Sequence, residues 1–163
     1  MNEPIIEMVT ALGKQLCQRD WRLAVAESCT GGWIAKVITD IAGSSLWFER
    51  GFVTYSNLSK QELLGVSTQV LQQHGAVSAA TATAMVKGAI THSNADVALA
   101  VTGIAGPNGA MPTKPVGTVW FAWVVPGSEL CVHCRYFSGD RNTIRYQAVQ
   151  YALLELLDIL QEL

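Results

Sequence analysis

The chain has 163 residues, the size of one domain that can bury a hydrophobic core. Its 11 basic and 13 acidic side chains give a net charge of −2, which leaves no basic field for a nucleic acid or an anionic membrane. Half of the residues are hydrophobic and only 15% are charged. We therefore expect residues 1–163 to form one domain with a large core, and some surplus apolar surface covered in a homo-oligomer, with a dimer favoured.

No apolar run reaches the roughly 20 residues that span a bilayer, and the start MNEPIIEM lacks the order of a secretory signal. The sequence therefore predicts a cytoplasmic protein without a membrane anchor, whose four cysteines are reduced. Cys131 and Cys134 are not expected to hold a metal, because a strand places Cys131 and His133 on one face and Cys134 on the other.

The chain begins with apolar residues spaced by three and four, which predict a helix from about Glu3 to Arg19. The short apolar stretch at 22–26 predicts a strand, and the sequence ESCTGG then interrupts it. Helical spacing resumes from Trp33 to Ile41. Ser28 is therefore expected at a turn from strand to helix.

A second strand is predicted near Gly51 to Tyr55, followed by a short helix that Ser56 caps and that contains Lys60 in its first turns. Serines also precede two further predicted helices. These helices begin after Ser67 and Ser78 and end at Gly75 and about His92.

The second half of the chain predicts a buried strand, a hairpin and a final helix. Asp96 to Thr102 is almost continuously apolar, which is typical of a strand covered on both faces. The segments 117–125 and 130–137 flank Pro-Gly-Ser and predict an antiparallel hairpin, and Asp140 can cap a long last helix. The order α-β-α-β-α-α-α-β-β-β-α predicts an α/β fold whose mixed sheet is covered by helices.

Three polar or glycine-rich segments follow predicted strands, at 28–32, 55–60 and 102–109. In open α/β sheets ligands bind beyond the carboxyl ends of the strands, so these segments are expected to face one crevice. Glycines at strand ends can also simply close turns. The run GIAGPNG has neither the spacing of a dinucleotide fingerprint nor the Gly-Lys-Ser/Thr of a P-loop.

Ser28 is the candidate nucleophile, since it would lie beside unpaired N–H groups at the start of a helix. The same N–H groups could bind an oxyanion or simply hold a phosphate, so both interpretations remain open. Cys29 is a rival nucleophile at the same turn.

A base for Ser28 is needed, and none of the three histidines lies beside a glycine-rich turn. A lysine buried in a cleft has a lowered pKa and can act as a neutral base, which makes Lys60 the candidate. Tyr55 could hydrogen-bond to both residues from the end of its strand. The alternatives are a solvated lysine and a tyrosine that packs in the strand. Positive charge for a phosphate could come from Lys114, Arg141 or Arg145.

Five motifs in order carry a resemblance to a known family. They are AESCTGG at 26–32, GFVTYSNLSK at 51–60, TGIAGPNG at 102–109, KPVGTVWFA at 114–122 and FSGDR at 137–141. Over almost its whole length the chain resembles the bacterial nicotinamide-nucleotide amidohydrolases, which are similar to the C-terminal domain of the competence- and damage-inducible protein CinA. One departure is Ala110, where relatives often carry a second glycine.

The resemblance implies hydrolysis of nicotinamide mononucleotide to nicotinate mononucleotide and ammonia, without metal or organic cofactor. It assigns catalysis to Ser28, Lys60 and Tyr55. It also implies that the substrate lies among residues of both glycine-rich turns and two arginines: Cys29, Thr30, Gly31, Gly32, Thr102, Gly103, Ala105, Gly106, Arg141 and Arg145. A domain that only binds or senses a nucleotide, and an amidase for another small carboxamide, are the alternatives.

Overall fold

A computed structural model describes residues 3–163 and contains the predicted helices and strands in the predicted order. The helices are α1 (Glu3–Gln18), α2 (Trp33–Thr39), α3 (Asn57–Leu64), α4 (Thr68–His74), α5 (Ala79–Thr91) and α6 (Arg141–Gln161). The strands are β1 (Leu23–Glu27), β2 (Phe48–Val53), β3 (Val97–Gly103), β4 (Thr118–Val124) and β5 (Cys131–Tyr136). A short 3₁₀ helix at Ser44–Leu46 was not predicted.

The strands form one mixed sheet in the order β2-β1-β3-β4-β5. Strand β1 pairs in parallel with both β2 and β3, whereas β4 is antiparallel to β3 and to β5. The carboxyl ends of β1, β2 and β3 therefore meet at the same edge of the sheet. This is the edge at which the sequence predicted a ligand crevice.

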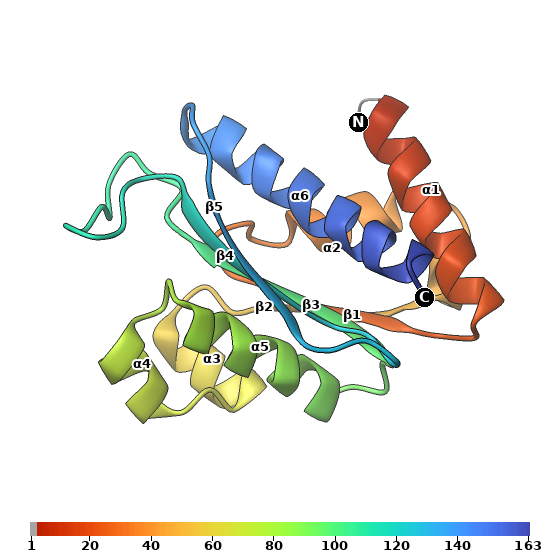
Figure 1. The fold of residues 1–163 in the computed structure, drawn as a ribbon, viewed down its shortest axis with the longest axis horizontal. Coiled ribbons are helices and arrows are strands. Elements are labelled where there is room, and N and C mark those ends of the chain that lie inside the picture. Colours follow the sequence, from red (N-terminus) through yellow and green to blue (C-terminus); the bar gives the residue numbers. More distant parts are fainter. Residues whose placement is uncertain (1–2) are drawn as a thin grey trace.

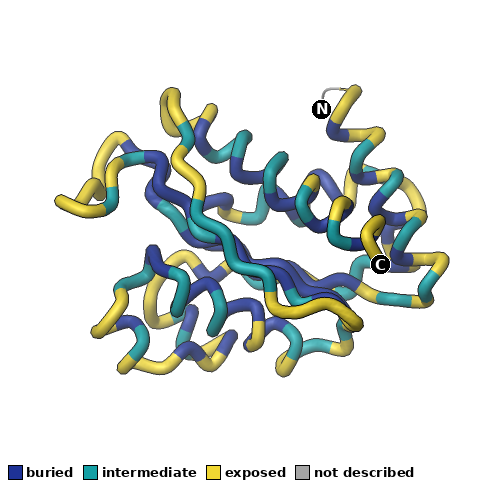
Figure 2. Tube along the Cα trace, in the orientation of Figure 1, coloured by how far each residue is buried: buried dark blue, intermediate teal, exposed yellow. Residues whose placement is uncertain are grey.

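Helices cover both faces of the sheet, with α1, α2 and α6 on one face and α3, α4 and α5 on the other (Figure 1). On the α1/α2/α6 face the strands bury large residues such as Leu23, Leu99 and Phe121. On the α5 face the strands carry mostly alanine at the alternate positions. These small residues let α5 lie close to the sheet. Because helices cover both faces, the central strands β1 and β3 are buried (Figure 2).

The close approach continues from α5 to α3. A Cβ on Gly88 of α5 would overlap the carbonyl oxygen of Leu64, the last residue of α3. Glycine at this position therefore lets α3 pack tightly against α5. Because Lys60 lies one turn before Leu64 on the same buried side of α3, this packing also fixes where Lys60 points.

Strand β2 was predicted at Gly51 to Tyr55 and instead runs from Phe48 to Val53. It is an edge strand, so the charged residue Arg50 can face solvent within it. Its end comes earlier than predicted because Tyr55 leads into the cap of α3. Within residues 3–163, no helix has both the length and the apolar composition needed to cross a membrane.

Candidate active site

The turn after β1 carries Ser28 and is held by the buried residue that precedes it. The Glu27 carboxylate accepts hydrogen bonds from the N–H groups of Ile34 (2.9 Å) and Ala35 (3.0 Å), at the start of α2. The N-cap residue of α2 is Gly32, which has no side chain to cap the helix, so the Glu27 carboxylate takes this role. The N–H groups of Ile34 and Ala35 are therefore not available to a ligand. Glu27 was not singled out from the sequence.

Free backbone donors remain in the turn itself. The N–H of Ser28 donates to Val101 and that of Gly31 donates back to the Ser28 carbonyl. Within the described residues 3–163, no protein acceptor takes the N–H of Cys29 or of Thr30. Thr30 is completely buried, so the N–H group of Cys29 is the donor beside Ser28 that a ligand can reach.

Lys60 lies in the first turn of α3, and the start of this helix sets its position. Ser56 and Ser59 form a reciprocal capping box, which sets where the helix begins. Lys60 then falls on the buried side of the helix, and its side chain is only 1% exposed. The local sequence therefore brings an amine to the end of a strand 32 residues away.

The Lys60 amine lies within hydrogen-bond distance of three oxygens. Its Nζ is 3.0 Å from Ser28 Oγ, 2.8 Å from the Thr54 carbonyl oxygen and 3.4 Å from the Tyr55 carbonyl oxygen. Two carbonyls can only accept, so they orient two N–H bonds of the amine. The third position of the nitrogen then faces the serine hydroxyl, where a neutral amine has its lone pair.

No carboxylate in the described part of the chain forms an ion pair with Lys60. Burial lowers the pKa of Lys60 from its ordinary value of 10.5 to about 8. About one molecule in ten then carries the neutral amine at pH 7. The lysine is therefore suited to accept a proton from Ser28.

Cys29 has the opposite character. It is buried, and that burial raises the pKa of its thiol to about 12, with the nearby Glu27 contributing in the same direction. A thiol of this kind is almost entirely protonated near neutral pH. The structure therefore favours Ser28 over Cys29 as the nucleophile.

A pocket of about 270 Å³ opens above this pair, at the lower end of the size range of small-molecule sites. Most of its lining comes from the three segments that the sequence predicted to share a crevice. The lining includes Ser28, Cys29, Tyr55, Lys60, Thr102, Gly103, Ala105, Gly106 and Arg141.

Similarity to known proteins identifies the family of this chain. Residues 6–160 match the model of the family described as the CinA C-terminal domain. The chain belongs to the CinA C-terminal domain family.

Three relatives place the chain within that family. It is 51% identical to the nicotinamide-nucleotide amidohydrolase PncC of Escherichia coli (strain K12), over 93% of this chain and 92% of that protein. It is 52% identical to a CinA-like protein of Akkermansia muciniphila, over 88% of this chain but 34% of that protein. The crystal structure of the competence/damage inducible protein CihA from Agrobacterium tumefaciens superposes with a TM-score of 0.93 at 42% identity, covering 99% of this chain and 98% of that one.

In this member of the CinA family, Tyr55 does not lie as the sequence predicted. Its side chain is 61% exposed, and Arg141 Nη2 donates to its phenol oxygen at 3.0 Å. Within residues 3–163 no hydrogen bond joins the phenol to Ser28 or Lys60; only the Tyr55 carbonyl reaches the amine. The other arm of Arg141 donates to the Gly106 carbonyl at 2.7 Å. Tyr55 and Arg141 thus form one wall of the pocket.

Four other predicted site residues lie on the far side of the turn. Arg145 of α6 donates to the carbonyls of Cys29 and Thr30, both at 3.0 Å, and its guanidinium lies 5.4 Å from the centre of the Trp33 ring. With Gly31 and Gly32 it borders a separate, open hollow rather than the pocket, and Thr30 lines neither. None of these four residues lines the pocket above Ser28.

Sequence reasoning missed one wall of the pocket, which the loop between α4 and α5 supplies through Ala76 and Val77. Thr102 Oγ1 donates to the Ala76 carbonyl at 2.8 Å and fixes this loop to the end of β3. Small apolar residues in a loop carry no chemical signal, so only the packing of α5 reveals them. Ile104, Asn108 and Gly109 of the predicted glycine-rich turn complete the lining.

Proposed function

We propose that this protein hydrolyses the carboxamide of nicotinamide mononucleotide to nicotinate mononucleotide and ammonia. The observation that carries the proposal is the 3.0 Å approach of the buried Lys60 amine to the Ser28 hydroxyl. The printed name of the Escherichia coli relative, at 51% identity, supports the choice of substrate. A serine activated by a lysine is a known variant of the catalytic arrangement used for acyl transfer.

In the first half of the reaction, neutral Lys60 takes the proton of Ser28 while Oγ attacks the carboxamide carbon. The carbonyl oxygen becomes an oxyanion, which the unpaired N–H group of Cys29 stabilises. The C–N bond then breaks, and protonated Lys60 returns its proton to the leaving nitrogen. Ammonia departs and a nicotinoyl ester remains on Ser28.

In the second half, the same amine removes a proton from water, which attacks the ester carbon. The second tetrahedral intermediate collapses to nicotinate mononucleotide, and the Ser28 oxygen recovers its proton from Lys60. The substrate helps, because its cationic pyridinium ring withdraws electrons from the carboxamide and disfavours a second positive charge on Lys60. These steps use only groups of the protein and water.

Arg141 is the better placed of the two predicted arginines to bind the substrate phosphate, since it lines the pocket whereas Arg145 does not. Tyr55 acts from the same wall, with its phenol beside Arg141 rather than beside the serine. Thr102, Gly103, Ala105 and Gly106 form the floor against which the nucleotide lies. A homo-oligomer and a cytoplasmic location remain predictions from the composition of the chain.

The test is ammonia release from nicotinamide mononucleotide by the purified protein in the presence of a chelator. Ser28→Ala should lower kcat by at least about 10³-fold while the variant still folds and binds substrate. Near-normal turnover by Ser28→Ala would contradict the assignment of the nucleophile. Stabilisation of the wild type by the nucleotide without any turnover would instead favour a binding or sensing domain.

A further inference from the structure

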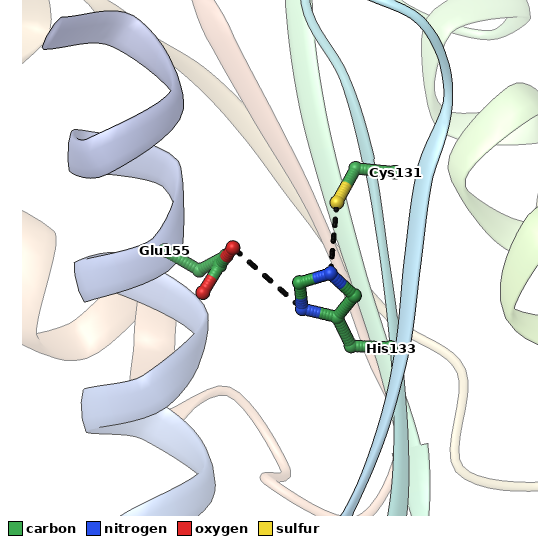
Figure 3. A group of neighbouring side chains, drawn as sticks. All are labelled: Cys131, His133 and Glu155. Atoms are coloured by element: carbon green, nitrogen blue, oxygen red, sulfur yellow. Dashed lines mark hydrogen bonds and ion pairs between the residues drawn. The ribbon is translucent and has the colours of Figure 1, made fainter. Parts of the chain in front are cut away.

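A second group of reactive side chains lies between the edge strand β5 and helix α6. Cys131 and His133 are two residues apart on β5, so their side chains project from the same face of the sheet toward α6. Glu155 of α6 faces them (Figure 3). The three ligand atoms all lie within 4.8 Å of one another. None of the three residues lines the pocket above Ser28.

We propose that Cys131, His133 and Glu155 form a binding site for a borderline divalent metal ion such as Zn²⁺. Thiolate, imidazole and carboxylate are the three ligand types that proteins use for zinc. A strand that presents two ligands at i and i+2, with a third from a facing helix, leaves a fourth position for water. All three side chains are partly exposed, so an ion has access from solvent.

The distances between the ligand atoms fit such an ion. Cys131 Sγ lies 3.3 Å from His133 Nε2. In a tetrahedral site, zinc bonds of about 2.3 Å to sulfur and about 2.0 Å to nitrogen place these two atoms about 3.6 Å apart. The Glu155 carboxylate lies 3.6 Å from His133 Nδ1, so this long side chain must rotate to reach an ion held by Cys131 and Nε2.

The other nitrogen of His133 already has the partner that a metal-bound histidine requires. His133 Nδ1 lies 2.7 Å from the Tyr151 hydroxyl. When Nδ1–H donates to this oxygen, Nε2 is the nitrogen that is free to bind a metal. Burial raises the pKa of Tyr151 to about 12, so the phenol stays neutral near pH 7.

The charges of the site also balance. Thiolate and carboxylate together neutralise a divalent ion, and the imidazole is neutral. Burial and the nearby Glu155 raise the pKa of the Cys131 thiol, whereas Arg135 lowers it. Binding therefore releases the thiol proton of Cys131 to solvent, and the affinity should rise with pH. An ion held here would tie the edge strand β5 to α6.

The test is titration of the metal-free full-length protein with Zn²⁺ by calorimetry and with Co²⁺ by absorption spectroscopy. We expect one ion per chain and a thiolate-to-cobalt charge-transfer band. A Zn²⁺ concentration about 100-fold above the dissociation constant should raise Tm by about 5–10 °C. Absence of one-to-one binding by either ion would overturn the proposal.

Variants locate the site on one face of β5. Cys131→Ser should abolish the charge-transfer band and weaken zinc binding by at least about 100-fold, and Tyr151→Phe should weaken it by about 10-fold. Cys134→Ser is the matched control, because its side chain is on the opposite face of the same strand, and it should bind zinc like the wild type. A charge-transfer band that survives Cys131→Ser, or disappears in Cys134→Ser, would contradict the assignment. Circular dichroism and amidase activity report whether each variant folds.

Discussion

Two basic side chains reach the turn at 28–32 from opposite sides of the sheet, and their surroundings differ. Arg145 comes from α6 and donates to two backbone carbonyls while it stacks on Trp33. Lys60 comes from α3 and touches two other carbonyls, but its third partner is the Ser28 hydroxyl. A guanidinium stays charged at any accessible pH, whereas a buried amine can lose its proton. Arg145 therefore holds the turn in place, whereas Lys60, with similar hydrogen bonds, can take a proton from Ser28.

Removal of the Lys60 amine should have the largest effect, and that effect is on catalysis. Lys60→Met removes the amine but retains an unbranched side chain, and we expect kcat/KM to fall by at least about 10³-fold. Lys87→Met, at an exposed lysine of α5, is the matched control and should retain activity. Turnover of Lys60→Met within about tenfold of the wild type would show that another group activates Ser28.

The same substitution should affect stability in the opposite direction. Because the folded pKa of Lys60 is about 8 and the unfolded value is near 10.5, the unfolded chain binds more protons between these pH values. Charging the buried amine thus costs about 3 kcal/mol below pH 8, and the cost disappears as the pH rises to about 10.5.

Removing the amine also removes its hydrogen bond to the Thr54 carbonyl, which offsets about 1–2 kcal/mol. We therefore expect Lys60→Met to be about 1–2 kcal/mol more stable than the wild type at pH 7, with this advantage lost toward pH 10. Urea unfolding at both pH values measures the difference. An equal difference at pH 7 and pH 10 would mean that Lys60 carries no penalty for its charge.

Substitution of Arg141 or Arg145 should have smaller effects, and these effects should differ between the two residues. Arg141→Gln should raise KM for nicotinamide mononucleotide by roughly 10-fold to 100-fold with little change in kcat, because the phosphate contact is made in substrate and transition state alike. Arg145→Gln should change KM less and mainly lower Tm by a few degrees, since it loses two hydrogen bonds to the turn. Steady-state kinetics and thermal unfolding of both variants separate the two roles, and a reversed pattern would assign the phosphate to Arg145.

The order of helices and strands was predictable because apolar spacing, serine caps and glycines mark each element in the sequence. The approach of Lys60 to Ser28 could be anticipated in outline, since both residues follow parallel strands that end at one edge. The role of Glu27 could not be anticipated, because its carboxylate binds the N–H of a residue seven positions later and no local sequence pattern marks this contact. The position of the Tyr55 phenol and the wall at Ala76 depend on long-range packing in the same way. Glu155 likewise joins Cys131 and His133 only through the packing of α6 on β5.

The proposed mechanism needs a Lys60 amine that faces Ser28 and loses its proton near pH 8. The most direct measurement is an NMR titration of the protein with ¹³C-labelled lysine ε-carbons, in which Lys60→Arg identifies the signal of Lys60. We expect the Lys60 signal to titrate with an inflection near pH 8. A Lys60 signal that stays cationic until about pH 10.5 would contradict this mechanism.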